Sequence, residues 1–94
     1  MSTIQVVSRK KLKEMLEQRN FWSRMLSGKL QSVEQYRAPA KKILGGTSYI
    51  ISYYDEHSRY VFTIHKIQDK NGQVRHRHAK NAIIDGVRYK AAEK

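Results

Sequence analysis

Residues 59–84 read RYVFTIHKIQDKNGQVRHRHAKNAII, two stretches suited to β-strands on either side of a turn. In the first stretch, 59–67, apolar and polar side chains alternate, so Tyr60, Phe62 and Ile64 are expected on one face. The turn, 69–72, suits a type I turn closed by a left-handed glycine, or a tighter Asn-Gly turn. The second stretch, 73–84, completes a predicted β-hairpin.

The flanking sequence extends this hairpin in both directions. Residues 47–54 are rich in β-branched and aromatic residues and are followed by a polar turn at 55–58. Beyond the hairpin, Asp85 and Gly86 form another turn signal, and 87–90 a short strand. The second half of the chain is therefore predicted to be an antiparallel meander of three or four strands.

The first half is predicted to be mainly helical. Ser8 is placed to cap a helix over about 9–27, in which apolar residues recur at helical spacing from Leu12 to Leu26. Asn20 is a candidate break within it, and Gly28 a C-terminal stop. Residues 32–44 begin with a capping-box pattern and predict a second helix, interrupted at Pro39. Residues 3–7 fit either a short strand or a disordered lead.

These patterns predict an α+β fold in which the N-terminal helices pack on the C-terminal meander. The length of 94 residues predicts a single domain over 1–94. No apolar run is long enough to cross a bilayer, so we expect no membrane partner and a cytoplasmic location. The absence of cysteine excludes disulfides and thiolate metal sites.

Charge is the strongest functional signal. Lys and Arg number 19 against 8 Asp and Glu, which gives a formal net charge of +11. Such an excess is typical of proteins that bind polyanions, most often nucleic acid. Basic residues in the first helical turn oppose the helix dipole, which also favours a functional role for them.

Basic and aromatic residues on the first helix and the strands are the candidate contacts to nucleic acid. Between Lys70 and Ile84 there is no carboxylate, and strand alternation places Arg75 and Arg77 on one face and His76, His78 and Lys80 on the other. Strand tyrosines are candidates for stacking on bases or for packing in the core. The predicted nucleic-acid-binding set is Lys10, Lys11, Lys13, Lys70, Arg75, Arg77, Lys80, Arg88, Lys90, Tyr49 and Tyr53.

Three histidines are candidates for a second kind of site, one that binds a metal ion or catalyses a reaction. His65, His76 and His78 can approach one another across the hairpin if the strand register allows it. Three imidazoles can hold zinc, or serve as general base and acid in RNA cleavage with Arg77 neutralising the phosphate. They also fit the role of partly exposed strand residues. We assign no metal and no cofactor from the sequence, and the lack of catalytic motifs favours binding over catalysis.

Residues 49–66 combine a tyrosine-rich strand, an acidic turn and an apolar strand that ends in His65 and Lys66. This stretch loosely resembles the RelE-like ribonuclease toxins. Those small basic proteins cut RNA with Arg, Lys, His or Tyr side chains on a sheet, so the resemblance implies a ribonuclease as the alternative function. The family's usual last helix has no counterpart after Lys90.

A third hypothesis is a small phage or mobile-element protein that binds and inhibits a host protein. In that case the positive charge would steer the chain toward an acidic protein surface. The sequence leaves the oligomeric state open.

Overall fold

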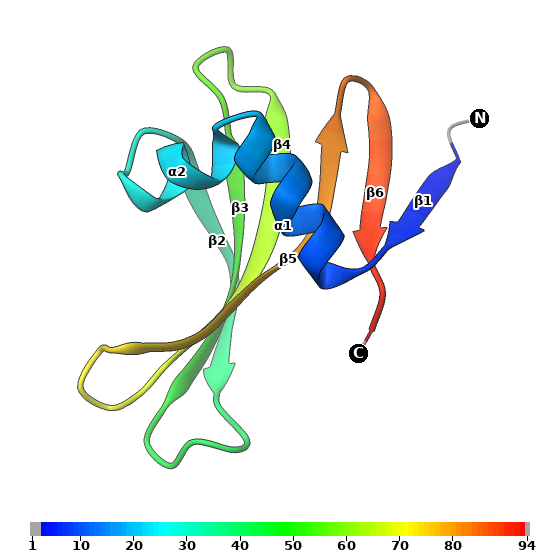
Figure 1. Ribbon diagram of the computed structural model, residues 1–94. Helices are drawn as coiled ribbons and strands as arrows, with labels where there is room; N and C mark the ends of the chain where they lie inside the picture. Colours follow the sequence, from blue (N-terminus) through cyan, green and yellow to red (C-terminus); the bar gives the residue numbers. More distant parts are fainter. Residues whose placement is uncertain (1–2, 94) are drawn as a thin grey trace.

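The computed structural model describes residues 3–93, which form two short helices and one six-stranded sheet (Figure 1). The strands lie in the order β1-β6-β5-β4-β3-β2, and all neighbours are antiparallel except β1 and β6, which are parallel. The elements are β1 (Ile4–Val7), α1 (Arg9–Gln18), α2 (Phe21–Leu26), β2 (Gln31–Pro39), β3 (Thr47–Tyr54), β4 (Tyr60–Gln68), β5 (Val74–Ile84) and β6 (Val87–Ala91).

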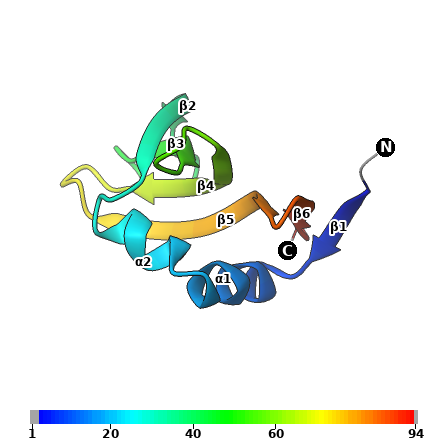
Figure 2. The ribbon, with the colours of Figure 1, turned by 90° about the horizontal axis from the view of Figure 1, so that it is seen from above.

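Both helices lie on the same side of the sheet, and the sheet curls away from them through β4, β3 and β2 (Figure 2). We call the covered side the helix face and the other side the open face. Register assigns residues to each: Ile51, Ile64 and Ala79 share the helix face, whereas Ile50, His65 and His78 share the open face. The two faces carry different chemistry, because the helices bury one and leave the other accessible.

The hydrophobic core lies between the helices and the helix face. Leu12 and Leu16 of α1 are fully buried, and Trp22 of α2 stacks on Phe62 of β4 with ring centroids 6.1 Å apart. Tyr53 stacks on the same Phe62 ring at 5.2 Å. Phe62 therefore joins the helices to the centre of the sheet.

The predicted start and break of the first helix are confirmed. The Ser8 hydroxyl accepts a hydrogen bond from the backbone N–H of Lys11 at 3.0 Å. Asn20, with φ at 64°, separates α1 from α2, and asparagine is among the few residues that adopt this conformation at low cost. The turn after β4 is also as predicted, because Gly72 N–H bonds to the Asp69 carbonyl and Gly72 has φ of 83°.

The predicted helix over 32–44 is wrong. Residues 31–39 form strand β2, which pairs with the edge of β3. Backbone pairing along β3 satisfies more N–H and C=O groups than the local capping box at Ser32 can, and β-forming Val33 and Tyr36 fit it. Pro39 is tolerated because it ends an edge strand.

The three- to four-stranded meander is also an underestimate, since the sheet has six strands. β2 extends the antiparallel part, and residues 4–7 form β1, which docks parallel to β6. Sequence periodicity gives no sign of a parallel pairing between the two ends of the chain. In residues 3–93, no helix is long and apolar enough to cross a membrane.

The predicted alternation of side chains between the two faces along residues 59–67 is interrupted by a β-bulge. Tyr53 pairs with Phe62 but Tyr54 pairs with Tyr60, so Val61 is an extra residue in β4. Tyr60 thereby moves to the open face, where its hydroxyl donates to Asn81 Oδ1 at 2.5 Å. Val61 joins the hydrophobic core.

Phe62→Ala is expected to lower the free energy of unfolding by about 3–5 kcal/mol, because it leaves a cavity between the helices and the sheet. Leu44→Ala is the matched control, since the Leu44 side chain is 98% exposed and should change stability by less than about 0.5 kcal/mol. Urea unfolding followed by circular dichroism measures both. Equal losses in the two variants would contradict this placement of the core.

Candidate nucleic-acid interface

Carboxylates are concentrated in turns and on the helix side of the molecule, where they pair with arginines. Arg24 bonds to Glu56 at 2.8 Å, and Arg37 bonds to Glu34 at 2.8 Å on the helix face of β2. Further pairs join Arg19 to Asp85, Arg59 to Asp55 and Arg75 to Asp69. Within residues 3–93 these pairs occupy most of the carboxylates and include no lysine.

On the open face, three adjoining hollows form what we call the open-face groove. A hollow of about 390 Å³ is lined by Arg9, His65, His78, Lys80, Asn81 and Lys90 with residues 91–93. It shares Asn81 and Lys90 with a hollow of about 470 Å³ that reaches Arg88 and Ile4. It shares Arg9 and the two histidines with a hollow of about 680 Å³ that reaches β2 and the loop after it.

The groove is strongly cationic. Its basic lining residues are Arg9, Lys41, Lys42, Lys80, Arg88 and Lys90, and none of them makes an ion pair in the described part of the chain. Among residues 3–93, Glu93 is the one carboxylate that lines these three hollows. The groove therefore gathers six basic residues around little negative charge. Elsewhere in residues 3–93 the five paired arginines are neutralised, while other cations also make no ion pair: Lys10, Lys11, Lys13, Lys29, Lys66, Lys70 and Arg77.

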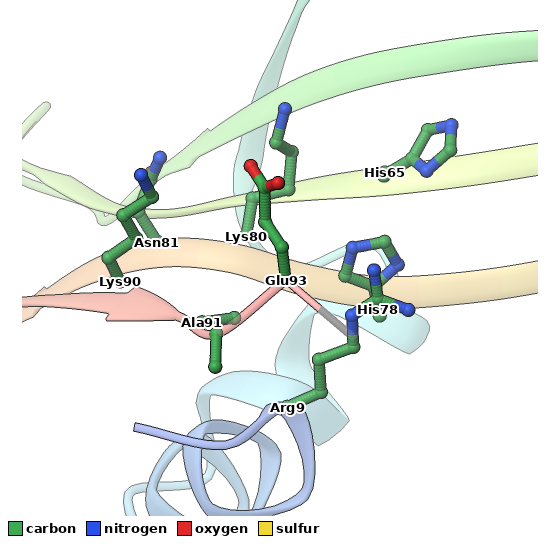
Figure 3. A pocket seen from close by; sticks show the side chains of 9 residues that line it. Arg9, His65, His78, Lys80, Asn81, Lys90, Ala91 and Glu93 are labelled. Carbon is green, nitrogen blue, oxygen red and sulfur yellow. The ribbon is translucent and has the colours of Figure 1, made fainter. Parts of the chain in front are cut away.

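Three separate elements bring the charges together, as Figure 3 shows. Arg9, the first residue of α1, extends its guanidinium toward His78. Lys80 is the extra residue of a bulge in β5, because Thr63 pairs with Asn81 while Ile64 pairs with Ala79. Lys90 comes from β6, where pairing with Asn81 sets it on the open face.

The register of β4 and β5 brings the three histidines together. His65 pairs directly with His78, and Ile67 pairs with His76, so all three rings lie on the open face. Their centroids are 4.8–5.7 Å apart. Nε2 of His76 lies 2.7 Å from Nδ1 of His78, so one of the two rings donates a proton to the other. Nε2 of His65 lies 2.7 Å from the Ser48 hydroxyl.

Burial and positive neighbours keep the His65 and His78 rings neutral by lowering the pKa of each. Burial, followed by the nearby Arg9 charge, lowers the pKa of His78 to about 4. Burial also lowers the pKa of His65, with the neighbouring His76 adding to the effect. At pH 7 the groove's positive charge therefore comes from lysine and arginine, while His65 and His78 supply neutral imidazoles.

The structure divides the predicted binding set between the two faces. Lys80, Arg88 and Lys90 line the groove. Arg77 shares the helix face with Lys66, so the predicted catalytic group of three histidines and Arg77 does not come together. Arg75, the extra residue of another bulge, pairs with Asp69 at 3.6 Å.

The tyrosines singled out in the sequence also lie on the helix face. Tyr49 sits between Arg37 and Lys66, whose charged groups are 5.2 and 5.1 Å from the ring centroid. Tyr53 packs on Phe62, and burial raises its pKa. Tyr49 and Tyr53 thus contribute to packing beside the core rather than to the groove.

The remaining predicted lysines lie outside the groove. Lys10, Lys11 and Lys13 are exposed on α1, and the Lys13 ammonium is 5.4 Å from the Trp22 ring centroid. Lys70 is in the turn between β4 and β5, with its side chain against Gly45. None of these four lines any of the three hollows.

Sequence reasoning missed Arg9, Lys41, Lys42 and Tyr36 as groove residues. Arg9 belongs to the basic cluster in the first helical turn, so the composition of that turn was a usable signal. Lys41, Lys42 and Tyr36 were placed in a helix that does not exist. These residues line the groove because β2 pairs with β3, and the local sequence pattern gives no sign of that pairing.

Comparison of the chain with protein-family models, curated proteins and solved structures found no match. The resemblance of residues 49–66 to the RelE-like toxins therefore remains an expectation, and the open-face groove is the feature from which a function can be inferred.

Lowering the pH should destabilise the folded chain, because His78 takes up a proton more readily in the unfolded chain. Its pKa is lowered in the folded chain, so the unfolded chain binds the proton first as pH falls below about 6.5. The free energy of unfolding should fall between about pH 6.5 and 4 and depend less on pH in His78→Gln. Urea unfolding at a series of pH values with a chelator present measures this. An unchanged pH dependence in the variant would contradict the burial of a neutral His78.

Proposed function

We propose that this protein binds nucleic acid by holding the phosphate backbone in the open-face groove. The supporting observation is the set of cations that lines the groove, which make no ion pair within the described part of the chain and face one described carboxylate there. Fixed cations attract phosphates and displace condensed counterions, which provides affinity without sequence recognition. We also propose a cytoplasmic location for the protein.

The convergence of cations from separate elements makes the groove the preferred binding surface. Acidic groups near Arg19, Arg24 and Arg37 neutralise cations on the helix side. At the groove, by contrast, Lys80, Lys90 and Arg9 line one hollow, and cations that converge on one hollow can attract a polyanion together. Phosphate contacts here come from the sheet and from the start of the first helix.

Tyr36 supplies a candidate base contact. It is 60% exposed and lines, from β2, the hollow that Arg9, Lys41 and Lys42 also line. An exposed ring next to cations can stack on an unpaired base. This assigns to Tyr36 the stacking role that the sequence analysis gave to Tyr49 and Tyr53.

Replacing both Lys80 and Lys90 by Ala should weaken binding to RNA and DNA of any sequence by more than about tenfold at low salt. Each lost phosphate contact should also reduce the salt slope of log K by about 1. Lys29→Ala with Lys70→Ala is the matched control, because it removes two lysines that line none of the three hollows. Fluorescence anisotropy with labelled single-stranded and duplex oligonucleotides, titrated with salt, measures both variants.

The proposal fails if the two double variants lose affinity equally, or if the unmodified chain binds no nucleic acid at low salt. Absence of nucleic-acid binding, together with an acidic protein partner that survives nuclease treatment, would favour the protein-inhibitor hypothesis.

Tyr36→Ala should weaken binding of single strands by about fivefold to a hundredfold, as expected for about 1–3 kcal/mol of base stacking. Binding of duplexes, whose bases are already stacked, should change little. Tyr54→Ala is the comparison, because Tyr54 lies on the same face but its ring packs on Tyr60 at 5.8 Å. Anisotropy on paired single-stranded and duplex probes measures this. Equal losses on both probes would exclude stacking by Tyr36.

RNA cleavage is the second candidate function, favoured by the three imidazoles beside Arg9 and Lys80. General acid catalysis works best with a pKa near the working pH. With its pKa lowered to about 4, His78 is neutral at pH 7 and is a poor proton donor there. We therefore rank binding above cleavage, and intact RNA after long incubation with folded protein would agree with that order.

A further inference from the structure

The three histidines of the open face form a cluster with the composition of a metal site. One nitrogen from each of His65, His76 and His78 lies within 4.8 Å of the other two. All three side chains are partly buried. They project from β4 and β5, which are paired along most of their length.

We propose that His65, His76 and His78 bind one divalent transition-metal ion, with zinc as the ion to test. Imidazole suits zinc, and a site with three histidines leaves a fourth position open to water or an oxyanion. This inference concerns the histidines alone and stands whether or not the groove binds nucleic acid.

The three imidazole rings need to move only slightly to coordinate one metal ion. Tetrahedral zinc with bonds of about 2.0–2.1 Å sets its ligand nitrogens about 3.3 Å apart. His76 and His78 are slightly too close, at 2.7 Å, and must exchange their shared proton for the metal. The nitrogens that are up to 4.8 Å apart must approach, which ring rotation on a fixed backbone can provide.

Ser48 gives the cluster a supporting contact. Its hydroxyl lies 2.7 Å from Nε2 of His65, which leaves Nδ1 of that ring free to bind the metal. Metal-bound imidazoles commonly keep such a hydrogen bond on the second ring nitrogen, because it fixes the ring's orientation. Ser48 is therefore a positioning residue in this proposal.

The charged residues near the three histidines affect both the affinity for a metal ion and the choice of its fourth ligand. Arg9, Lys80 and Lys90 line the same hollow, and Lys41 and Lys42 line the adjoining one; the carboxylate that lines them within residues 3–93 is that of Glu93. These cations repel a metal ion and weaken its binding. They also favour an oxyanion in the open fourth position over a further neutral ligand.

Isothermal titration of zinc into the chelator-treated, tag-free full chain tests the proposal. We expect one zinc per chain, with affinity reduced about tenfold to a hundredfold or more in His76→Ala and in His78→Ala. His57→Ala is the matched control, because His57 lies in the turn between β3 and β4 with a 64% exposed side chain. Circular dichroism checks that each variant is folded.

A second measurement needs no variant. Cobalt(II) added to the unmodified chain should give the intense visible absorption of a four-coordinate site, and excess zinc should remove it. Nuclear magnetic resonance of the imidazole nitrogens should show zinc-induced shifts for His65, His76 and His78 but not for His57. Absence of stoichiometric zinc binding, or equal loss in His57→Ala, would overturn the proposal.

Discussion

The pairing of β4 with β5 is the constraint on which the rest of this structure depends. It aligns Phe62 with Ala82 and Ile64 with Ala79, which gives α1 and α2 an apolar surface to cover. The same pairing sets His65 opposite His78 on the other face. A shift by one residue would bury histidines beneath the helices and expose the core, so stability and site chemistry are fixed together.

Bulges refine this pairing and determine which side chains reach the groove. The extra residue Val61 transfers Tyr60 to the open face, where it bonds to Asn81. A second bulge makes Lys80 the extra residue in β5, beside the histidines and Arg9. Bulges interrupt regular pairing and redirect side chains, which is why they are frequent next to functional sites.

Much of the second half of the fold could be predicted from the sequence, because strand alternation and the Asp69–Gly72 turn are local signals. The capping of α1 by Ser8 and the break at Asn20 were local signals too. The strand over 31–39 could not be predicted in this way, since its stability comes from pairing with β3 rather than from its own sequence. The groove was only partly predictable: Lys80, Arg88 and Lys90 were named, but Arg9 joins them only through the packing of α1.

Convergence of cations on the open-face groove is the central functional claim, and mapping the bound surface tests it most directly. Amide and side-chain chemical shifts of the labelled chain would be followed while a short oligonucleotide is added at low salt. The account predicts perturbations centred on Lys80, Lys90 and Arg9 along the open face. Perturbations centred instead on Lys10, Lys11 and Lys13, on α2 and on Tyr49 would contradict it.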